Sequence, residues 1–294
     1  MEPTFIPSLT AVNDITFTSG LPVMTGTVNL YNIYYGNFSS ESSQQMKPLV
    51  DYFSDNIGSS DYYNIMTKYY QIIQGVKTFV SNSVKWIKSI SISSNIQIPL
   101  DNSKATAIIT NLISTGQLPL DPNGVYAFIF KGNIPFSTLY TGSWLTTWCG
   151  YHSAFYYTDG KTLIKYFITG DPSTSTASNA AGCKPAARIG ATTTPNNNVG
   201  ADSIASIYAH ELVEVVSNYA GAWYWRTGGP NLGKENADLC TGSFGPLLPG
   251  STDANVIVGA KKWLIQQNWI PQFGCGTSLP QSKTLFNDVF INIL

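Results

Sequence analysis

Hydrophobic and polar residues alternate with a short period in several parts of this chain, and that alternation predicts β-strands. Residues 24–40 alternate and end in a Gly-Asn turn, as expected for a strand and its exit. Residues 72–99 are rich in Ile, Val and Ser, and residues 124–132 form an apolar run. Residues 149–170 contain two β-rich runs around an Asp-Gly pair. The chain is therefore predicted to contain further strands, a buried strand and a hairpin.

Apolar residues recur at helical spacing in four other segments, residues 39–58, 60–71, 101–119 and 201–221. The last segment is the clearest predicted helix, and its apolar positions are Ile204, Ile207, Tyr208, Leu212, Val215, Val216 and Tyr219. Asp202 or Ser203 is the expected N-cap, and Gly221 is the expected end of the helix.

This order of elements predicts an α+β fold with a mixed β-sheet. We expect an N-terminal extension over residues 1–23, one domain over 24–277 and a C-terminal tail over 278–294, whose last ten residues suggest a strand. Within the domain, an α/β lobe is expected to end near residue 221, followed by a C-terminal lobe. Residues 170–200 have little periodicity, and long segments of this kind often carry function or cover a site.

The amino-acid composition argues against several classes of function. Only 11% of the 294 residues are charged, so the polar surface must consist largely of Ser, Thr, Asn, Gln and Tyr. The net charge is −1 and basic residues do not cluster, which gives no support for binding to nucleic acid or to an anionic membrane. No segment is apolar for long enough to predict a membrane span, and residues 1–20 do not have the pattern of a signal peptide.

Four widely spaced cysteines predict two disulfides rather than a zinc ribbon, because no C-x-x-C pair occurs. Three pairings are possible. We favour Cys149–Cys183 and Cys240–Cys275, because each of these pairs closes a loop within one region of the chain. Four buried free thiols are the alternative. Disulfides would place the protein in an oxidising location, either extracellular or on a particle surface.

The candidate chemistry centres on the stretch AHELVE in the clearest helix. His210 and Glu214 are four residues apart, so their side chains lie about forty degrees from each other around the helix axis and share one face. Imidazole and carboxylate both bind zinc, and the Glu that follows the first His in an H-E-x-x-H motif is the general base. Glu211 has that position. A helix-surface pair of His210 and Glu214 without a metal is the alternative.

A third ligand is expected from the segment ENADLC. Glu235 lies 21 residues after Glu214, a distance at which the gluzincin class of metallopeptidases supplies its third ligand, and Asp238 would orient the ligand histidine. The alternative is the reverse assignment, with Asp238 as the ligand and Glu235 as the orienting residue. With Glu214 in place of the second histidine, the site carries one more negative charge. This lowers the Lewis acidity of bound zinc and also makes another divalent metal possible.

The second of the two histidines, His152, follows a cysteine in the stretch CGYH. We predict a catalytic role for it, either as a further ligand or as a group that stabilises an oxyanion. The alternative is a histidine beside a disulfide that bonds only to the backbone.

Five segments together resemble the phosphate-induced protein 1 family, also called EXORDIUM-like. The residues that carry the resemblance are GTVNLYNIYYGNFSSESSQ, CGYH, VGADSIASIYAHELVEVVSNYAGAWY, ENADLC and KKWLIQQNWIP. The resemblance implies an extracellular protein, associated in plants with the cell wall and growth. Many plant members lack the H-E-x-x-E residues, and the presence of His210, Glu211 and Glu214 is similar to the branch that retains them.

We therefore expect a zincin-like metallopeptidase core, with an active-site helix and a C-terminal lobe that bears Glu235. The expected function is that of a zinc-dependent metallopeptidase-like hydrolase of peptides or proteins. The alternative is a non-catalytic extracellular, cell-wall or particle-surface protein, which binds a surface component and in which the metal is structural or absent. Polysaccharide binding through the many Trp and Tyr residues is a third hypothesis.

Overall fold

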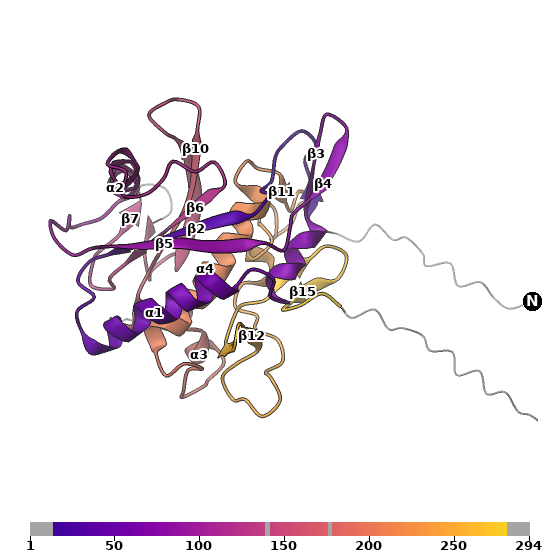
Figure 1. Cartoon of the computed structure of the whole chain (residues 1–294). Helices are drawn as coiled ribbons and strands as arrows, with labels where there is room; N and C mark the ends of the chain where they lie inside the picture. Colours follow the sequence, from indigo (N-terminus) through magenta and orange to yellow (C-terminus); the bar gives the residue numbers. More distant parts are fainter. Residues whose placement is uncertain (1–13, 139–141, 176–177, 281–294) are drawn as a thin grey trace, which may run out of the picture.

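A five-stranded mixed β-sheet lies at the centre of the computed structural model, which describes residues 14–138, 142–175 and 178–280 (Figure 1). The strands follow one another across the sheet in the order β5 (Val84–Ile92), β2 (Val28–Tyr35), β6 (Gly124–Phe130), β10 (Leu163–Gly170) and β9 (Gly150–Tyr156). The first four strands are mutually parallel, and β9 pairs antiparallel with β10 at one edge. The predicted α+β class with a mixed sheet is confirmed.

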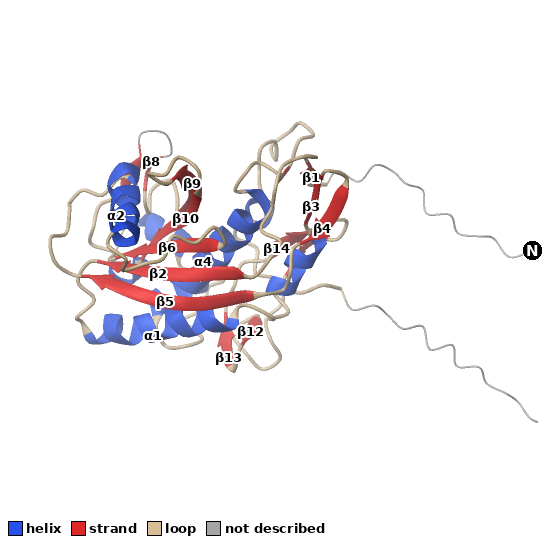
Figure 2. Cartoon of the chain, turned by 45° about the horizontal axis from the view of Figure 1, so that its top comes forward, coloured by secondary structure: helices blue, strands red, loops and turns tan. Residues whose placement is uncertain are grey.

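Helices cover both faces of this sheet (Figures 1 and 2). One face packs against α1 (Glu41–Asn56) and α4 (Val199–Asn218), and the other packs against α2 (Asn102–Ser114). The strands alternate between the two cores: Leu30 of β2 lies in the core with α1 and α4, and Tyr31 lies in the core with α2. Because both faces are buried, the central strands are almost continuously apolar.

The rest of the described chain forms short elements around the sheet. The strand pairs are β1 (Thr16–Phe17) with β11 (Trp223–Tyr224), β3 (Tyr70–Ile73) with β4 (Val76–Phe79), β7 (Ser137–Thr138) with β8 (Gly142–Ser143), β12 (Val256–Val258) with β13 (Lys261–Trp263), and β14 (Asn268–Ile270) with β15 (Gly274–Gly276). The short helices are η1 (Tyr63–Lys68), η2 (Pro172–Thr174), η3 (Ser178–Cys183), α3 (Pro185–Arg188) and η4 (Asp238–Cys240). Among the described helices, none combines the length and the apolar character needed to cross a membrane.

The start of helix α4 differs from the prediction. Helix α4 begins at Val199 and is capped by Asn198, whose side-chain oxygen accepts a hydrogen bond from the Ala201 amide at 2.9 Å. Asp202, predicted as a possible cap, instead accepts hydrogen bonds from Asn196. Within residues 170–200, the described parts contain short helical turns, which a search for long periodic segments does not detect.

Residues 14–23, which were assigned to an N-terminal extension, contact the core in the structure. Ile15 and Val23 are buried, and β1 pairs with β11, which follows α4. An extended segment of so few residues gives no periodic signal, so sequence alone could not place it. The strand predicted at 285–294 lies outside the described residues, and the division of the domain into two lobes stays a prediction.

A buried polar network joins β2 to the two helices on its face. Asn32 is fully buried, and its amide nitrogen donates to Asp51 of α1 at 2.8 Å and to Ser54 at 3.1 Å. Its amide oxygen accepts a hydrogen bond from the Tyr208 hydroxyl of α4 at 2.9 Å. Asp51 also accepts from the Tyr34 hydroxyl at 2.7 Å. This network fixes α4 against the sheet two residues before His210.

Replacing Asn32 should test this network. The Asn32→Ala change removes the hydrogen bonds that Asn32 makes to the buried Tyr208 hydroxyl, to Asp51 and to Ser54. We expect it to lower the free energy of unfolding by about 2–3 kcal/mol, measured by urea denaturation. Asn123→Ala, at an exposed turn, is the matched control and should change stability by less than about 0.5 kcal/mol. Equal stability of the two variants would show that the network does not hold α4.

Candidate metal centre

The centre is built on α4, which is buried along almost its whole length. Because four residues complete slightly more than one turn, His210 and Glu214 lie on the same side of the helix. His210 Nε2 lies 3.3 Å from Glu214 Oε2. Glu211 and Glu214 are each 3% exposed, so both carboxylates are enclosed by protein. The helix therefore presents one imidazole and two buried carboxylates together.

His152 reaches this centre from the edge strand β9. In the β9–β10 hairpin it is paired with Phe167, and its ring points at the carboxylates of α4. Its Nδ1 atom lies 3.3 Å from Glu211 Oε2 and 3.4 Å from Glu214 Oε2. Its Nε2 atom lies 3.3 Å from Glu235 Oε2. The histidine is therefore not confined to backbone contacts, which was the alternative considered for it.

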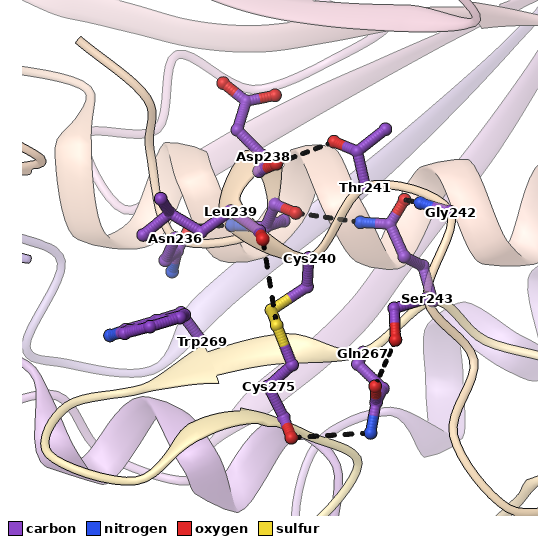
Figure 3. The surroundings of a disulfide bond; sticks show 12 residues. Asn236, Asp238, Leu239, Cys240, Thr241, Gly242, Ser243, Gln267, Trp269 and Cys275 are labelled. Atoms are coloured by element: carbon purple, nitrogen blue, oxygen red, sulfur yellow. Dashed lines mark hydrogen bonds between the residues drawn. A yellow bond between two sulfur atoms is a disulfide. The ribbon is translucent and has the colours of Figure 1, made fainter. Parts of the chain in front are cut away.

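The segment ENADLC returns to α4 as predicted from the spacing. Asn218, the last residue of α4, donates a hydrogen bond to Glu235 Oε1. The backbone amide of Asp238 donates to Glu214 Oε1 at 3.0 Å. Figure 3 shows this segment in front of a helix, with the Asp238 side chain pointing away from the nearby disulfide. The main chain thus holds one oxygen of Glu214 while the other oxygen faces the two histidines.

Among the residues that the structure describes, two groups of side chains could each hold a metal ion, because the ligand atoms within each group lie within 4.8 Å of one another. One group consists of His152, Glu214 and Glu235, and the other consists of His210, Glu211 and Glu214. Glu214 belongs to both. The structure thus brings the predicted residues to one place and includes His152, predicted as a catalytic group or a further ligand, in one of the two groups. The ligand set His210, Glu214 and Glu235 stays a prediction.

The contact that orients His210 comes from Gln266, which sequence reasoning missed. Its amide nitrogen lies 2.9 Å from His210 Nδ1 and 2.9 Å from the Ala237 carbonyl oxygen, to which it donates. Asp238 also lies beside His210, with Oδ1 3.6 Å from Nε2, and its predicted role in orienting the histidine stays a prediction. Gln266 lies in the stretch KKWLIQQNWIP, but no spacing rule relates it to His210.

Gly150, also missed, leaves room for the centre. A side chain at this position would bring its Cβ atom 2.7 Å from Glu211 Oε1 and 2.6 Å from Ile207. Such contacts are too short, so the glycine allows β9 to approach α4 closely. The CGYH stretch therefore combines the close approach at Gly150 with the contact made by His152.

Burial and neighbouring charges together set the pKa values of the groups in the centre. Burial raises the pKa of the Glu211 carboxyl, and burial together with the neighbouring Glu214 raises the pKa of Glu235. Burial opposes ionisation of Glu214 as well, but the two histidines outweigh it and hold its pKa below its usual range.

The pKa values of the two histidines are shifted in the opposite direction from that of Glu214. Burial by itself lowers the pKa of His152 and of His210, but the surrounding carboxylates outweigh burial and raise both pKa values well above the ordinary value. Buried carboxylates at this density require a positive partner. A metal ion or a protonated histidine meets that requirement.

Both predicted disulfides are present, and the described cysteines include no free thiol. The Cys149–Cys183 bridge joins the start of β9 to the 170–200 segment, and the Cys240–Cys275 bridge joins the ENADLC segment to β15 (Figure 3). Each disulfide therefore fixes a segment that brings a side chain to the centre, His152 in one case and Glu235 in the other.

Comparison with known sequences identifies the family. The model of the phosphate-induced protein 1 conserved region matches residues 15–262. The chain belongs to the phosphate-induced protein 1 family. The match begins at Ile15, which is buried in the structure, and it includes His152, His210, Glu214 and Glu235.

One similar curated protein is Protein EXORDIUM-like 5 of Arabidopsis thaliana, which is 34% identical over 90 residues. The alignment covers 26% of this chain and 24% of that relative, so this family member spans about a quarter of the relative's length. No solved structure matches the chain.

Removal of the second disulfide gives a prediction about stability. Cys240 and Cys275 are 35 residues apart, and opening a loop of this length costs about 3–4 kcal/mol in the chain-entropy account. We expect the double Cys240→Ala, Cys275→Ala variant to lose about that much free energy of unfolding, measured by urea denaturation. Wild type treated with reductant and then alkylated should lose at least as much. A loss below about 1 kcal/mol would contradict this role for the bridge.

Proposed function

We propose that this member of the phosphate-induced protein 1 family is a zinc-dependent, metallopeptidase-like hydrolase. The observation that supports the proposal is the meeting of His152, His210, Glu211, Glu214 and Glu235, which come from three separate segments, around one buried point. His210, Glu214 and Glu235 would hold the ion. Their imidazole and carboxylate atoms are donors of the kind that zinc binds, and Glu214 lies within 3.5 Å of both histidines.

We also propose that these groups form a zincin-like arrangement. An active-site helix packs under a mixed sheet, an antiparallel strand forms the sheet edge beside it, and a later segment supplies Glu235. The ion, when bound, would polarise a substrate carbonyl and lower the pKa of a water molecule. Glu211 would accept the proton of that water, because its raised pKa brings it closer to neutral pH than an ordinary glutamate.

His152 would act on the oxygen of the substrate. Its ring lies against Glu211, on the strand that borders the helix, and burial among carboxylates favours its protonated form. A protonated imidazole can donate to an oxygen that gains negative charge. If His152 is a ligand instead, the His152→Ala variant will lose its metal as well as its activity.

A location outside the cytosol is part of the proposal. Two disulfides suit an oxidising compartment, and the low content of charged residues agrees with an extracellular or surface protein. The substrate would then be a peptide or a protein outside the cell.

A non-catalytic surface protein is the second candidate, and one observation favours it. His152 contacts Glu211, Glu214 and Glu235 at 3.3–3.4 Å, so a protonated histidine can compensate these carboxylates without any metal. In that case the centre holds together the three segments that carry these residues and performs no chemistry, and the partner is a cell-wall or surface component.

Metal analysis and two variants separate the candidates. Protein purified without chelators should contain about one zinc ion per chain, and Glu214→Ala should lose it. Glu211→Gln should keep the zinc but lose about 10²–10⁴-fold in cleavage of a broad peptide library, because it removes the general base. No stoichiometric metal, together with unchanged thermal stability of Glu214→Ala, would refute the proposal. A wild type that contains zinc but cleaves nothing would favour the non-catalytic candidate.

Gln266 offers a test of the centre that does not depend on activity. Gln266→Ala removes the group held against His210 Nδ1 and should weaken zinc binding by about 10–100-fold, measured by competition with a chelating dye. Gln267→Ala is the matched control, because that side chain contacts Ser243 and the Cys275 carbonyl instead. Equal zinc affinity of the two variants would contradict the orienting role of Gln266.

A further inference from the structure

A cavity of about 270 Å³ lies beside the candidate metal centre. His210 and Glu211 line one part of it, and Trp148, Ile207 and Phe244 supply apolar walls. The size is close to the lower end of the range for small-molecule pockets, roughly 300–1,000 Å³. A substrate that reaches Glu211 therefore has a pocket next to it that can take a side chain or a chain end.

Arg188 is the only Lys or Arg residue among those that line the cavity. It is the last residue of α3, and its Nε donates to the Gly182 carbonyl at 2.5 Å. The neighbouring Cys183 is joined to Cys149 at the start of the β9 segment. The backbone around Arg188 is thus tied to the same strand that carries His152.

Gly242 makes room for the guanidinium group. A Cβ atom at this position would lie 2.1 Å from Arg188 Nη1, so any other residue would displace the arginine. The positive φ of Gly242, +76°, also favours glycine there. Arg188 is an exposed residue, and its guanidinium group lies between Gly182, which also lines the cavity, and Gly242.

The guanidinium of Arg188 has no acidic partner among the described residues, since none of the ion pairs found there includes it. The other arginine of the chain, Arg226, bonds to Tyr224 and Thr18 outside the cavity. Asp238 also lines the cavity, but its carboxylate faces His210. The guanidinium group of Arg188 is planar, and its Nε atom is already bonded to the Gly182 carbonyl. Its other N–H groups can donate two parallel hydrogen bonds to a carboxylate.

We propose that Arg188 binds a carboxylate of the substrate, so that the site prefers peptides with an acidic group close to the bond that is hydrolysed. The carboxylate belongs either to an Asp or Glu side chain or to the C-terminus of the peptide. This inference rests on the proposed hydrolase function and specifies its substrate class. The apolar walls contact the carbon atoms next to the carboxylate, and Arg188 selects its charge.

Binding, rather than cleavage, gives the test. Zinc-loaded Glu211→Gln protein is titrated calorimetrically with three hexapeptides of otherwise identical neutral sequence. The first has blocked ends and one Glu, the second has blocked ends and Gln at that position, and the third has Gln and a free C-terminus. We expect the first or the third peptide to bind at least about tenfold more tightly than the second, which also identifies the source of the carboxylate.

Second-site changes in the same protein assign the preference to Arg188. Arg188→Gln should abolish the tenfold difference and leave the affinity for the neutral peptide unchanged. Arg188→Lys should restore only part of the difference, because an ammonium group cannot form the paired hydrogen bonds. Arg226→Gln is the matched control and should retain the full difference. Unchanged thermal unfolding of Arg188→Gln verifies that α3 remains folded.

The outcomes separate this inference from the proposed function. Equal binding of all three peptides, no measurable binding at millimolar concentration, or an equal loss for charged and neutral peptides on Arg188→Gln would each overturn the inference. If wild type cleaves peptides without preference for a carboxylate, the hydrolase proposal survives and the role of Arg188 fails. If charged peptides bind selectively but wild type cleaves none, the role of Arg188 survives and hydrolysis fails.

Discussion

The carboxylate of Glu214 is the contact on which the candidate centre depends. One oxygen accepts a hydrogen bond from the backbone amide of Asp238 at 3.0 Å. The other oxygen lies 3.3 Å from His210 Nε2 and 3.4 Å from His152 Nδ1. Three segments that are far apart in the chain therefore meet at one buried side chain. The arrangement needs a rigid platform, and the polar network around Asn32 together with the apolar faces of α4 supplies it.

The protein contains few charged residues, and three of its glutamates lie together in the candidate centre. Only 11% of the residues are charged, yet Glu211, Glu214 and Glu235 gather in one partly enclosed place with both histidines of the chain. Removing carboxylates from water is unfavourable unless positive charge accompanies them, so this arrangement is difficult to explain by stability alone. Clusters of this kind occur preferentially at functional sites, which is the physical basis for placing the chemistry here.

The two disulfides hold the segments that form the candidate centre and the cavity beside it. The Cys149–Cys183 bridge ties the α3 region to the strand that bears His152, and the Cys240–Cys275 bridge holds the segment that bears Glu235. Both bridges act on segments with little regular structure of their own, which a hydrophobic core alone would hold weakly. Arg188 lines the same cavity as Glu211, so the cavity contains a cation as well as a carboxylate of the centre.

The sequence by itself determined the long elements and the chemical types at the centre. Periodicity located α4 and the central strands, because their side chains must face a core repeatedly. The spacing of His210, Glu211 and Glu214 follows from helix geometry, and local loop closure was enough to favour the correct disulfide pairs. Residues 15–23, Gln266 and Gly150 gave no signal, since one contact between distant segments leaves no period in the sequence.

Only the tertiary structure decided which of these residues meet. It placed His152 among all three glutamates, brought Gln266 to His210, and put Arg188 in the adjacent cavity. These contacts depend on strand order and on how loops cross the sheet edge. Local patterns of hydrophobic and polar residues carry no information about contacts of that range.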